Sequence, residues 1–173
     1  MVGKEKIKMK NRTSWLQSKM LPKAVVLIGV FLLPLTYVHE IGHAIPCFIE
    51  GHEYEIKIGL AGGYMQCKGV LENQIFFMSF GGLFAAFVSI VPFFISPKWV
   101  TRNGFVAIAV FSFSIAQAFN AVLETTFYEK YMTDTFLFVI IMNLFQITIF
   151  FLLGYKFSKK PITGVTSKEY LEK

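Results

Sequence analysis

An apolar run from Ala24 to Cys47 contains two histidines and a glutamate, in the motif HEIGH at positions 39–43. A run of this length is long enough to cross a bilayer as a helix. Polar side chains at that depth are costly unless they have a functional or structural partner. The chain must therefore fold so that other segments supply partners for these three side chains.

The spacing of the motif indicates a metal site. His39 and His43 are four residues apart and share one face of a helix, with Glu40 beside them. This is the H-E-x-x-H pattern, in which two imidazoles bind zinc and the carboxylate acts on its water. Glu40 would accept the water's proton and later donate it to the leaving amine. The alternative is that the histidines only hydrogen-bond between helices while Glu40 reaches the interface.

Composition and charge narrow the class of protein. The 173 residues are 54% hydrophobic and 17% aromatic, which is too apolar for a soluble domain of this size. The net charge of +6 arises mainly at the two ends, with seven Lys and Arg against one Glu in residues 1–23 and five Lys against two Glu in 155–173. Such segments meet the anionic leaflet of a lipid bilayer. We therefore expect a membrane protein and exclude nucleic-acid binding.

The apolar segments predict the architecture. Four of them are long enough to span a bilayer, at residues 24–51, 75–95, 105–126 and 136–154. After the first, apolar and charged residues alternate over 54–58 and a turn signal follows at 61–63, which predicts a β-hairpin, with an irregular loop as the alternative. We predict an all-α polytopic membrane protein with four transmembrane helices and a small β-hairpin between the first and second.

The charge pattern also predicts domains and topology. Residues 1–23 form a basic cytoplasmic arm with an interfacial segment, 24–154 a membrane-embedded metalloprotease domain, and 155–173 a basic cytoplasmic tail. The 96–104 loop is basic, whereas 50–74 and 127–135 are net acidic. By the positive-inside rule both termini are cytoplasmic, in a multi-pass protein of the cell membrane. The motif then lies toward the outer end of the first span.

A catalytic zinc needs a third protein ligand. Gln117, Asn120 and Glu124 recur at intervals of three and four, and such a polar stripe on an apolar span faces the interior of a helix bundle. Glu124 lies 19 residues into the third span, and His43 lies 19 residues into the first, which runs in the same direction. Asp134 follows near the same face. Glu124 and Asp134 are both candidates for the third ligand.

Each candidate also has an ordinary structural interpretation. Asn120 is placed to hydrogen-bond a substrate backbone or an oxyanion, or else another helix. Asp134 could cap the fourth span, and Glu124 could extend to the interface. His52 is a poor ligand candidate, because it lies nine residues beyond His43 rather than six.

The two cysteines give little signal. Cys47 and Cys67 form neither a C-x-x-C motif nor a disulfide framework. Cys47 lies four residues beyond His43 and shares its helix face, but a small buried side chain is the commoner role for such a residue. We expect Cys47 to be a buried free thiol.

Several motifs together resemble the site-2 protease family of intramembrane zinc metalloproteases. They are HEIGH in an apolar span, Gly-Gly-Tyr at 62–64 of the expected hairpin, the small-residue segment at 81–86, and Phe119-Asn120 followed by a later Asp. The resemblance covers roughly residues 24–150. It implies Asp134 as the third zinc ligand and Asn120 as a substrate contact. The Asn-Pro-Asp-Gly type of pattern is absent around Asp134, so Glu124 remains the alternative.

The functional prediction is a zinc-dependent intramembrane endopeptidase acting on membrane protein or peptide substrates. Zn²⁺ would be held by His39, His43 and Asp134, and the hairpin edge could hold an unwound substrate by strand addition. Members of the family generally cut near the cytosolic side, whereas charge counting places this site toward the outer face. The alternative function is a non-catalytic membrane protein, either a degenerate protease acting as a binding partner or a small transporter with a polar pathway.

Overall fold

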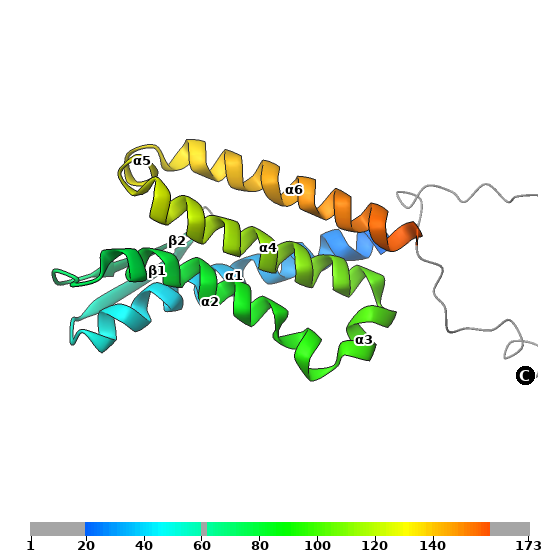
Figure 1. Cartoon of the computed structure of the whole chain (residues 1–173), viewed down its shortest axis with the longest axis horizontal. Coiled ribbons are helices and arrows are strands. Elements are labelled where there is room, and N and C mark those ends of the chain that lie inside the picture. Colours follow the sequence, from blue (N-terminus) through cyan, green and yellow to red (C-terminus); the bar gives the residue numbers. More distant parts are fainter. Residues whose placement is uncertain (1–19, 60–61, 160–173) are drawn as a thin grey trace, which may run out of the picture.

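The computed structural model describes residues 20–59 and 62–159. These residues form six helices and two strands (Figure 1). Their bounds are α1 Met20–Ile49, β1 Tyr54–Gly59, β2 Gly62–Cys67, α2 Gln74–Ile95, α3 Pro97–Arg102, α4 Gly104–Thr126, α5 Tyr128–Thr133 and α6 Thr135–Lys159. The predicted helical fold with a small hairpin between the first two spans is confirmed. Most of the expected basic arm and tail lies outside the described residues.

Four helices are long and apolar enough to cross a membrane. Their spans run over Leu21–Ile49, Gln74–Ile95, Gly104–Thr126 and Phe136–Phe157. Each contains 22 residues or more, and about 20 apolar residues suffice for the hydrocarbon core. A multi-pass membrane protein is the architecture that these helices fit. The short helices α3 and α5 lie in connections that were not predicted to be helical.

Helix α4 contacts the other three long helices, α1, α2 and α6, and helix α2 packs against both α1 and α4. The long helices run along the longest axis of the molecule, with the hairpin and α5 at one end and α3 at the other (Figure 1). Central helices in a membrane need small residues where their neighbours cross, because lipid supplies no hydrophobic drive for association. The small residues of α2 meet this need.

Two glycines on α2 and one on α1 allow these close crossings. A Cβ on Gly42 would lie 2.7 Å from the Cα of Gly81 and 2.9 Å from the carbonyl oxygen of Phe80. On the other side of α2, a Cβ on Gly82 would lie 2.6 Å from the carbonyl oxygen of Gln117. No side chain larger than hydrogen fits either crossing. Helix α1, which carries the HEIGH motif, and helix α4, which carries Gln117, Asn120 and Glu124, are thus both held against α2.

The hairpin packs on the last turns of α1. Strands β1 and β2 pair antiparallel, with Tyr54 opposite Cys67 and Gly59 opposite Gly62. Met65 on β2 joins Ala44 of α1 in a buried cluster at this end of the molecule. The hairpin prediction is therefore confirmed, and the hairpin covers the end of α1 that carries the motif.

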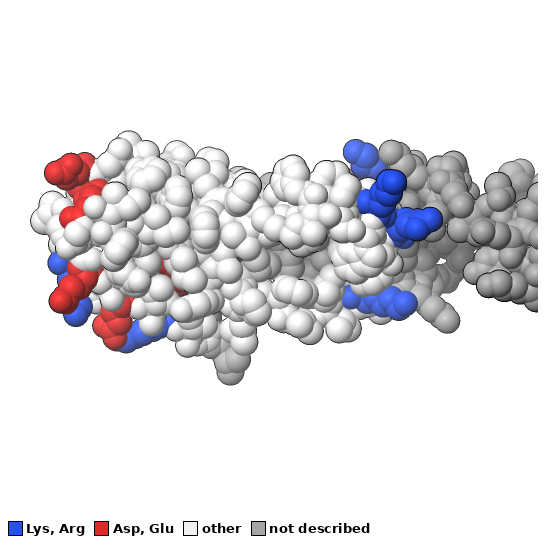
Figure 2. Space-filling view, turned by 90° about the horizontal axis from the view of Figure 1, so that it is seen from below, with Lys and Arg blue, Asp and Glu red and all other residues white. Residues whose placement is uncertain are grey.

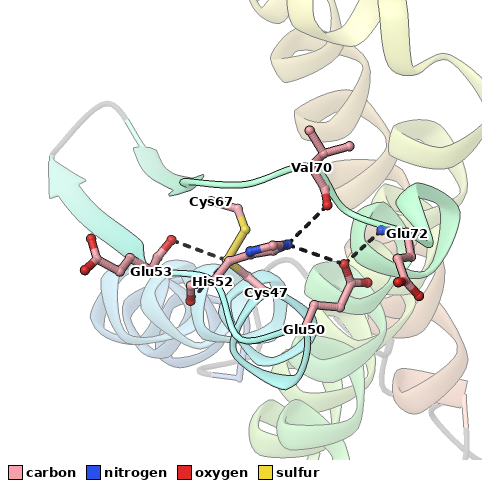
Figure 3. The surroundings of a disulfide bond; sticks show 7 residues. All are labelled: Cys47, Glu50, His52, Glu53, Cys67, Val70 and Glu72. Carbon is pink, nitrogen blue, oxygen red and sulfur yellow. Dashed lines mark hydrogen bonds and ion pairs between the residues drawn. A yellow bond between two sulfur atoms is a disulfide. The ribbon is translucent and has the colours of Figure 1, made fainter.

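A disulfide joins Cys47 of α1 to Cys67 of β2, with Cα atoms 5.9 Å apart (Figure 3). The expectation of a free thiol at Cys47 was therefore wrong. Pairing of β1 with β2 turns the chain back, so that the end of β2 meets the helix it left 20 residues earlier. Two isolated cysteines carry no information about this return, because it depends on the register of the hairpin.

Charged side chains gather at the two ends of the molecule. The view in Figure 2 shows the acidic residues at the end formed by the hairpin and α5, only Lys and Arg at the opposite end, and neither kind over the middle. The long uncharged middle is the part that a bilayer would cover. This distribution of charge in space agrees with the sequence, in which the 96–104 loop is basic and residues 50–74 and 127–135 are net acidic.

We predict that Gly42→Ala destabilises the protein, because its new methyl group would push α1 away from α2. Overpacking of this kind costs about 1–3 kcal/mol. Thermal unfolding in detergent would measure the loss. The matched control is Gly29→Ala on the same helix, where an added Cβ meets nothing within 4 Å. Equal stability of the two variants would contradict the close crossing.

Candidate metal centre

Two histidines of α1 and one glutamate of α4 converge in the bundle. His39 Nε2 lies 3.2 Å from Glu124 Oε1, and His43 Nε2 lies 3.5 Å from Glu124 Oε2. The two Nε2 atoms are 3.1 Å apart, and all three side chains are buried. Within the described residues, this is the one group of His, Cys, Asp or Glu that could hold a metal ion.

The outer nitrogen of each imidazole has an oxygen partner. His39 Nδ1 lies 3.0 Å from Oε1 of Gln117, and His43 Nδ1 lies 2.8 Å from the backbone oxygen of Phe77. Both oxygens are acceptors, so each Nδ1 carries a proton and donates it. An imidazole that donates from Nδ1 and carries no second proton directs the lone pair of its Nε2 atom toward Glu124. Outer contacts of this kind orient metal-binding histidines in general.

A cation among these atoms would remove a strong local repulsion. Two Nε2 lone pairs and a carboxylate face one another in a buried volume, where unpaired polar atoms are costly. Glu124 Oε2 is buried, and its polar neighbour His43 Nε2 lies 3.5 Å away. A proton on one histidine would form a hydrogen bond between only two of the three groups, whereas a metal ion at the centre would contact all three.

The spacing of the donor atoms fits zinc. Ligands at roughly 2.0–2.1 Å from a tetrahedral zinc are roughly 3.3 Å apart. The two Nε2 atoms are 3.1 Å apart, and His39 Nε2 and His43 Nε2 lie 3.2 Å from Oε1 and 3.5 Å from Oε2 of Glu124, all close to that value. Two imidazoles and one carboxylate also form a known donor set of catalytic zinc, which leaves one position open. The residues present therefore fit this metal.

Glu40 lies beside the cluster without belonging to it. It lines the same cavity of about 350 Å³ as His39, His43 and Glu124. A Cβ on Gly63 of β2 would lie 2.6 Å from Oε1 of Glu40, so the carboxylate rests directly on the backbone of the hairpin. The hairpin thus restricts the position of the buried Glu40 carboxylate.

The structure places Asp134 away from the cluster. This residue directly follows α5, and its exposed carboxylate accepts a hydrogen bond of 3.2 Å from the backbone N–H of Leu137 in the first turn of α6. Its side chain therefore caps a helix, which was its alternative interpretation. Glu124, the alternative candidate, lies with the two histidines, where the family resemblance had implied Asp134. The depth of Glu124 along α4 was the signal that found it.

Asn120 supports Glu124 from one turn away. Its Nδ2 donates to Glu124 Oε1 at 2.8 Å, and its Oδ1 accepts from the hydroxyl of Tyr131 at 3.5 Å. Burial, reinforced by the negative charge of Glu124, raises the pKa of Tyr131, so its hydroxyl remains a donor. Asn120 was expected to contact substrate or another helix, but here its amide orients the candidate ligand. Tyr131 lies on the unpredicted α5 and gave no signal in the sequence.

His52 lies outside the metal group, as its spacing suggested. Its Nε2 is 3.1 Å from the backbone oxygen of Val70 and 3.9 Å from a carboxylate oxygen of Glu50. These contacts fasten the segment after β2 to the end of α1 (Figure 3). The third histidine of the chain is therefore part of the scaffold at this end of the molecule.

A scan against protein-family models, a search of curated proteins and a search of solved structures found no match to this chain.

We predict that His39→Ala, His43→Ala and Glu124→Ala each abolish stoichiometric zinc binding, because each removes one of three converging donors. Asn120→Ala should weaken binding by about 10- to 100-fold, as is typical of residues that orient a metal ligand. Zinc titration of the purified variants measures these affinities. Asp134→Ala is the matched control and should keep its zinc. If Asp134→Ala loses the metal while Glu124→Ala keeps it, the assignment of the third ligand fails.

Proposed function

We propose that this protein is a zinc-dependent intramembrane endopeptidase of the site-2 protease type, which hydrolyses peptide bonds within or next to transmembrane segments. The observation that carries the proposal is the convergence of three buried donors at the spacing of zinc ligands, with a separate carboxylate in the same cavity. A purely structural cluster of polar side chains would not require the fourth group, Glu40. The HEIGH motif gives the same two roles from sequence alone.

Each group has a distinct chemical role in the proposed hydrolysis. His39, His43 and Glu124 would hold the ion, which supplies a Lewis acid that polarises the scissile carbonyl and lowers the pKa of water. Glu40 takes one proton from the water molecule as the water oxygen bonds to the carbonyl carbon. The same carboxyl group then gives that proton to the amide nitrogen as the C–N bond breaks. The products are a carboxyl and an amino terminus.

The hairpin supports the binding of an extended substrate. Among the described residues β2 pairs only with β1, so its other edge keeps free backbone donors and acceptors. Tyr64 and Met65 of β2 line the cavity that contains the metal ligands. A helical substrate hides its amides in hydrogen bonds and must unwind before attack. An unwound segment could pair with this strand edge and so present its amides to Glu40.

Glu40→Gln should retain zinc and lose proteolysis. The amide that replaces the carboxylate cannot accept the proton of water, while the three metal ligands are unchanged. General acid–base catalysis contributes typically 10²–10⁴-fold, so cleavage should fall by about that factor. Metal analysis together with cleavage of a reconstituted transmembrane substrate would measure both properties. A metal-loaded wild type without any peptidase activity would instead favour a non-catalytic protein.

Gly63→Ala should impair cleavage through Glu40. The new methyl group would overlap the Glu40 carboxylate and displace it from its place beside the cluster. We expect a lower kcat with unchanged zinc affinity, because the three ligands lie elsewhere. Gly59→Ala is the control on the neighbouring strand, since its Cβ would meet only one atom within 4 Å, at 3.8 Å. Equal kcat for both variants would separate the hairpin from catalysis.

A further inference from the structure

A second cavity borders the cavity of the candidate metal centre, on the side toward the acidic end of the molecule. Each has a volume of about 350 Å³, and they share the side chains of Tyr64, Met65, Phe77, Met78 and Tyr128. The second cavity extends along β2 and the loop after it as far as the first residue of α2. We call the two together the β2 groove. It leads from the buried cluster to the end of the molecule.

Three contacts hold the far wall of the β2 groove on the end of α1 (Figure 3). The Cys47–Cys67 disulfide anchors the last residue of β2. His52 Nε2 reaches the backbone oxygen of Val70, and a carboxylate oxygen of Glu50 accepts a 2.8 Å hydrogen bond from the backbone N–H of Glu72. One covalent bond and two polar contacts therefore hold the segment from Cys67 to Glu72 in a fixed position.

Two independent features place this end of the molecule on the oxidising side of the membrane. Disulfides persist in extracytoplasmic compartments and are rare where thiols are kept reduced. Lys and Arg gather at the opposite end, around α3 and the end of α6, and basic segments stay in the cytoplasm (Figure 2). Neither feature depends on the metal centre. Both give the same orientation.

We propose that the β2 groove opens to the extracytoplasmic side and binds an extended peptide segment next to the outer end of a transmembrane helix. Its orientation stands without the endopeptidase activity, whereas the peptide as occupant rests on that proposed function. The groove's walls suit this ligand, because a free strand edge offers backbone pairing and aromatic side chains offer apolar contact. The segment would pass from aqueous solution along β2 to Glu40.

Single cysteines on the full chain test the orientation. In the disulfide-bonded protein, the exposed residues Glu55 on β1 and Lys98 on α3 mark opposite ends. A membrane-impermeant maleimide should label Glu55→Cys in sealed right-side-out vesicles, and Lys98→Cys only after permeabilisation. The reverse pattern overturns the proposal. Labelling of the unsubstituted protein, denatured without reduction, would show free thiols and overturn the argument from the disulfide.

Protection of a groove residue tests the occupant without requiring cleavage. Gln74 lines the β2 groove, whereas its neighbour Ile75 does not and is 73% exposed. In zinc-loaded protein that also carries Glu40→Gln, a soluble synthetic peptide rich in Val and Thr should slow labelling of Gln74→Cys several-fold. Labelling of Ile75→Cys should be unchanged. No protection at millimolar peptide overturns the peptide as occupant, while an inactive wild type overturns only the endopeptidase function.

Discussion

Three electron-rich groups share one buried volume in this protein, and the structure around them is arranged so that they cannot turn away. The Nδ1 atoms of His39 and His43 are tied to Gln117 and to a backbone oxygen, and Asn120 holds one oxygen of Glu124. Each outer contact directs an acceptor inward. Such an arrangement is costly in a low-dielectric interior unless a cation lies at its centre. The polar residues of α4 therefore act together: Gln117 orients His39, and Asn120 orients Glu124.

These groups can come together because glycines occupy the close contacts between the helices. His43 lies so close to α2 that a Cβ on Gly81 would be 2.2 Å from its Nε2. The next residue, Gly82, lets α4 approach until its backbone nearly touches that of α2. Helix α2 thus packs closely against both helices that carry the candidate ligands, and α1 and α4 also contact each other. Because lipid gives no hydrophobic drive, van der Waals contact at these glycines supplies much of the association.

The sequence predicted what depends on local pattern and missed what depends on the path of the chain. The four spans followed from length and apolarity, the hairpin from alternation, and the two imidazoles from helical spacing. The third candidate ligand required a choice between two acidic residues, Glu124 and Asp134. Depth along parallel spans indicated Glu124, whereas motif resemblance indicated Asp134, which the short helix α5 carries to a capping position. The disulfide and Tyr131 depend on a hairpin register and an unpredicted helix, which no local pattern encodes.

One register connects the hairpin with the motif helix. Alternate residues of β2 face α1, and Gly63 meets Glu40, Met65 packs with Ala44, and Cys67 bonds to Cys47. Four residues of a strand advance about 13 Å, and seven residues of a helix advance about 10 Å, so the two elements stay in step over this distance. A slip of the hairpin by one residue would direct the Tyr64 side chain at Glu40 and turn Cys67 away from its partner. The disulfide at one end therefore specifies which residue lies over Glu40, the proposed catalytic acid, at the other, and only glycine leaves room there for the carboxylate.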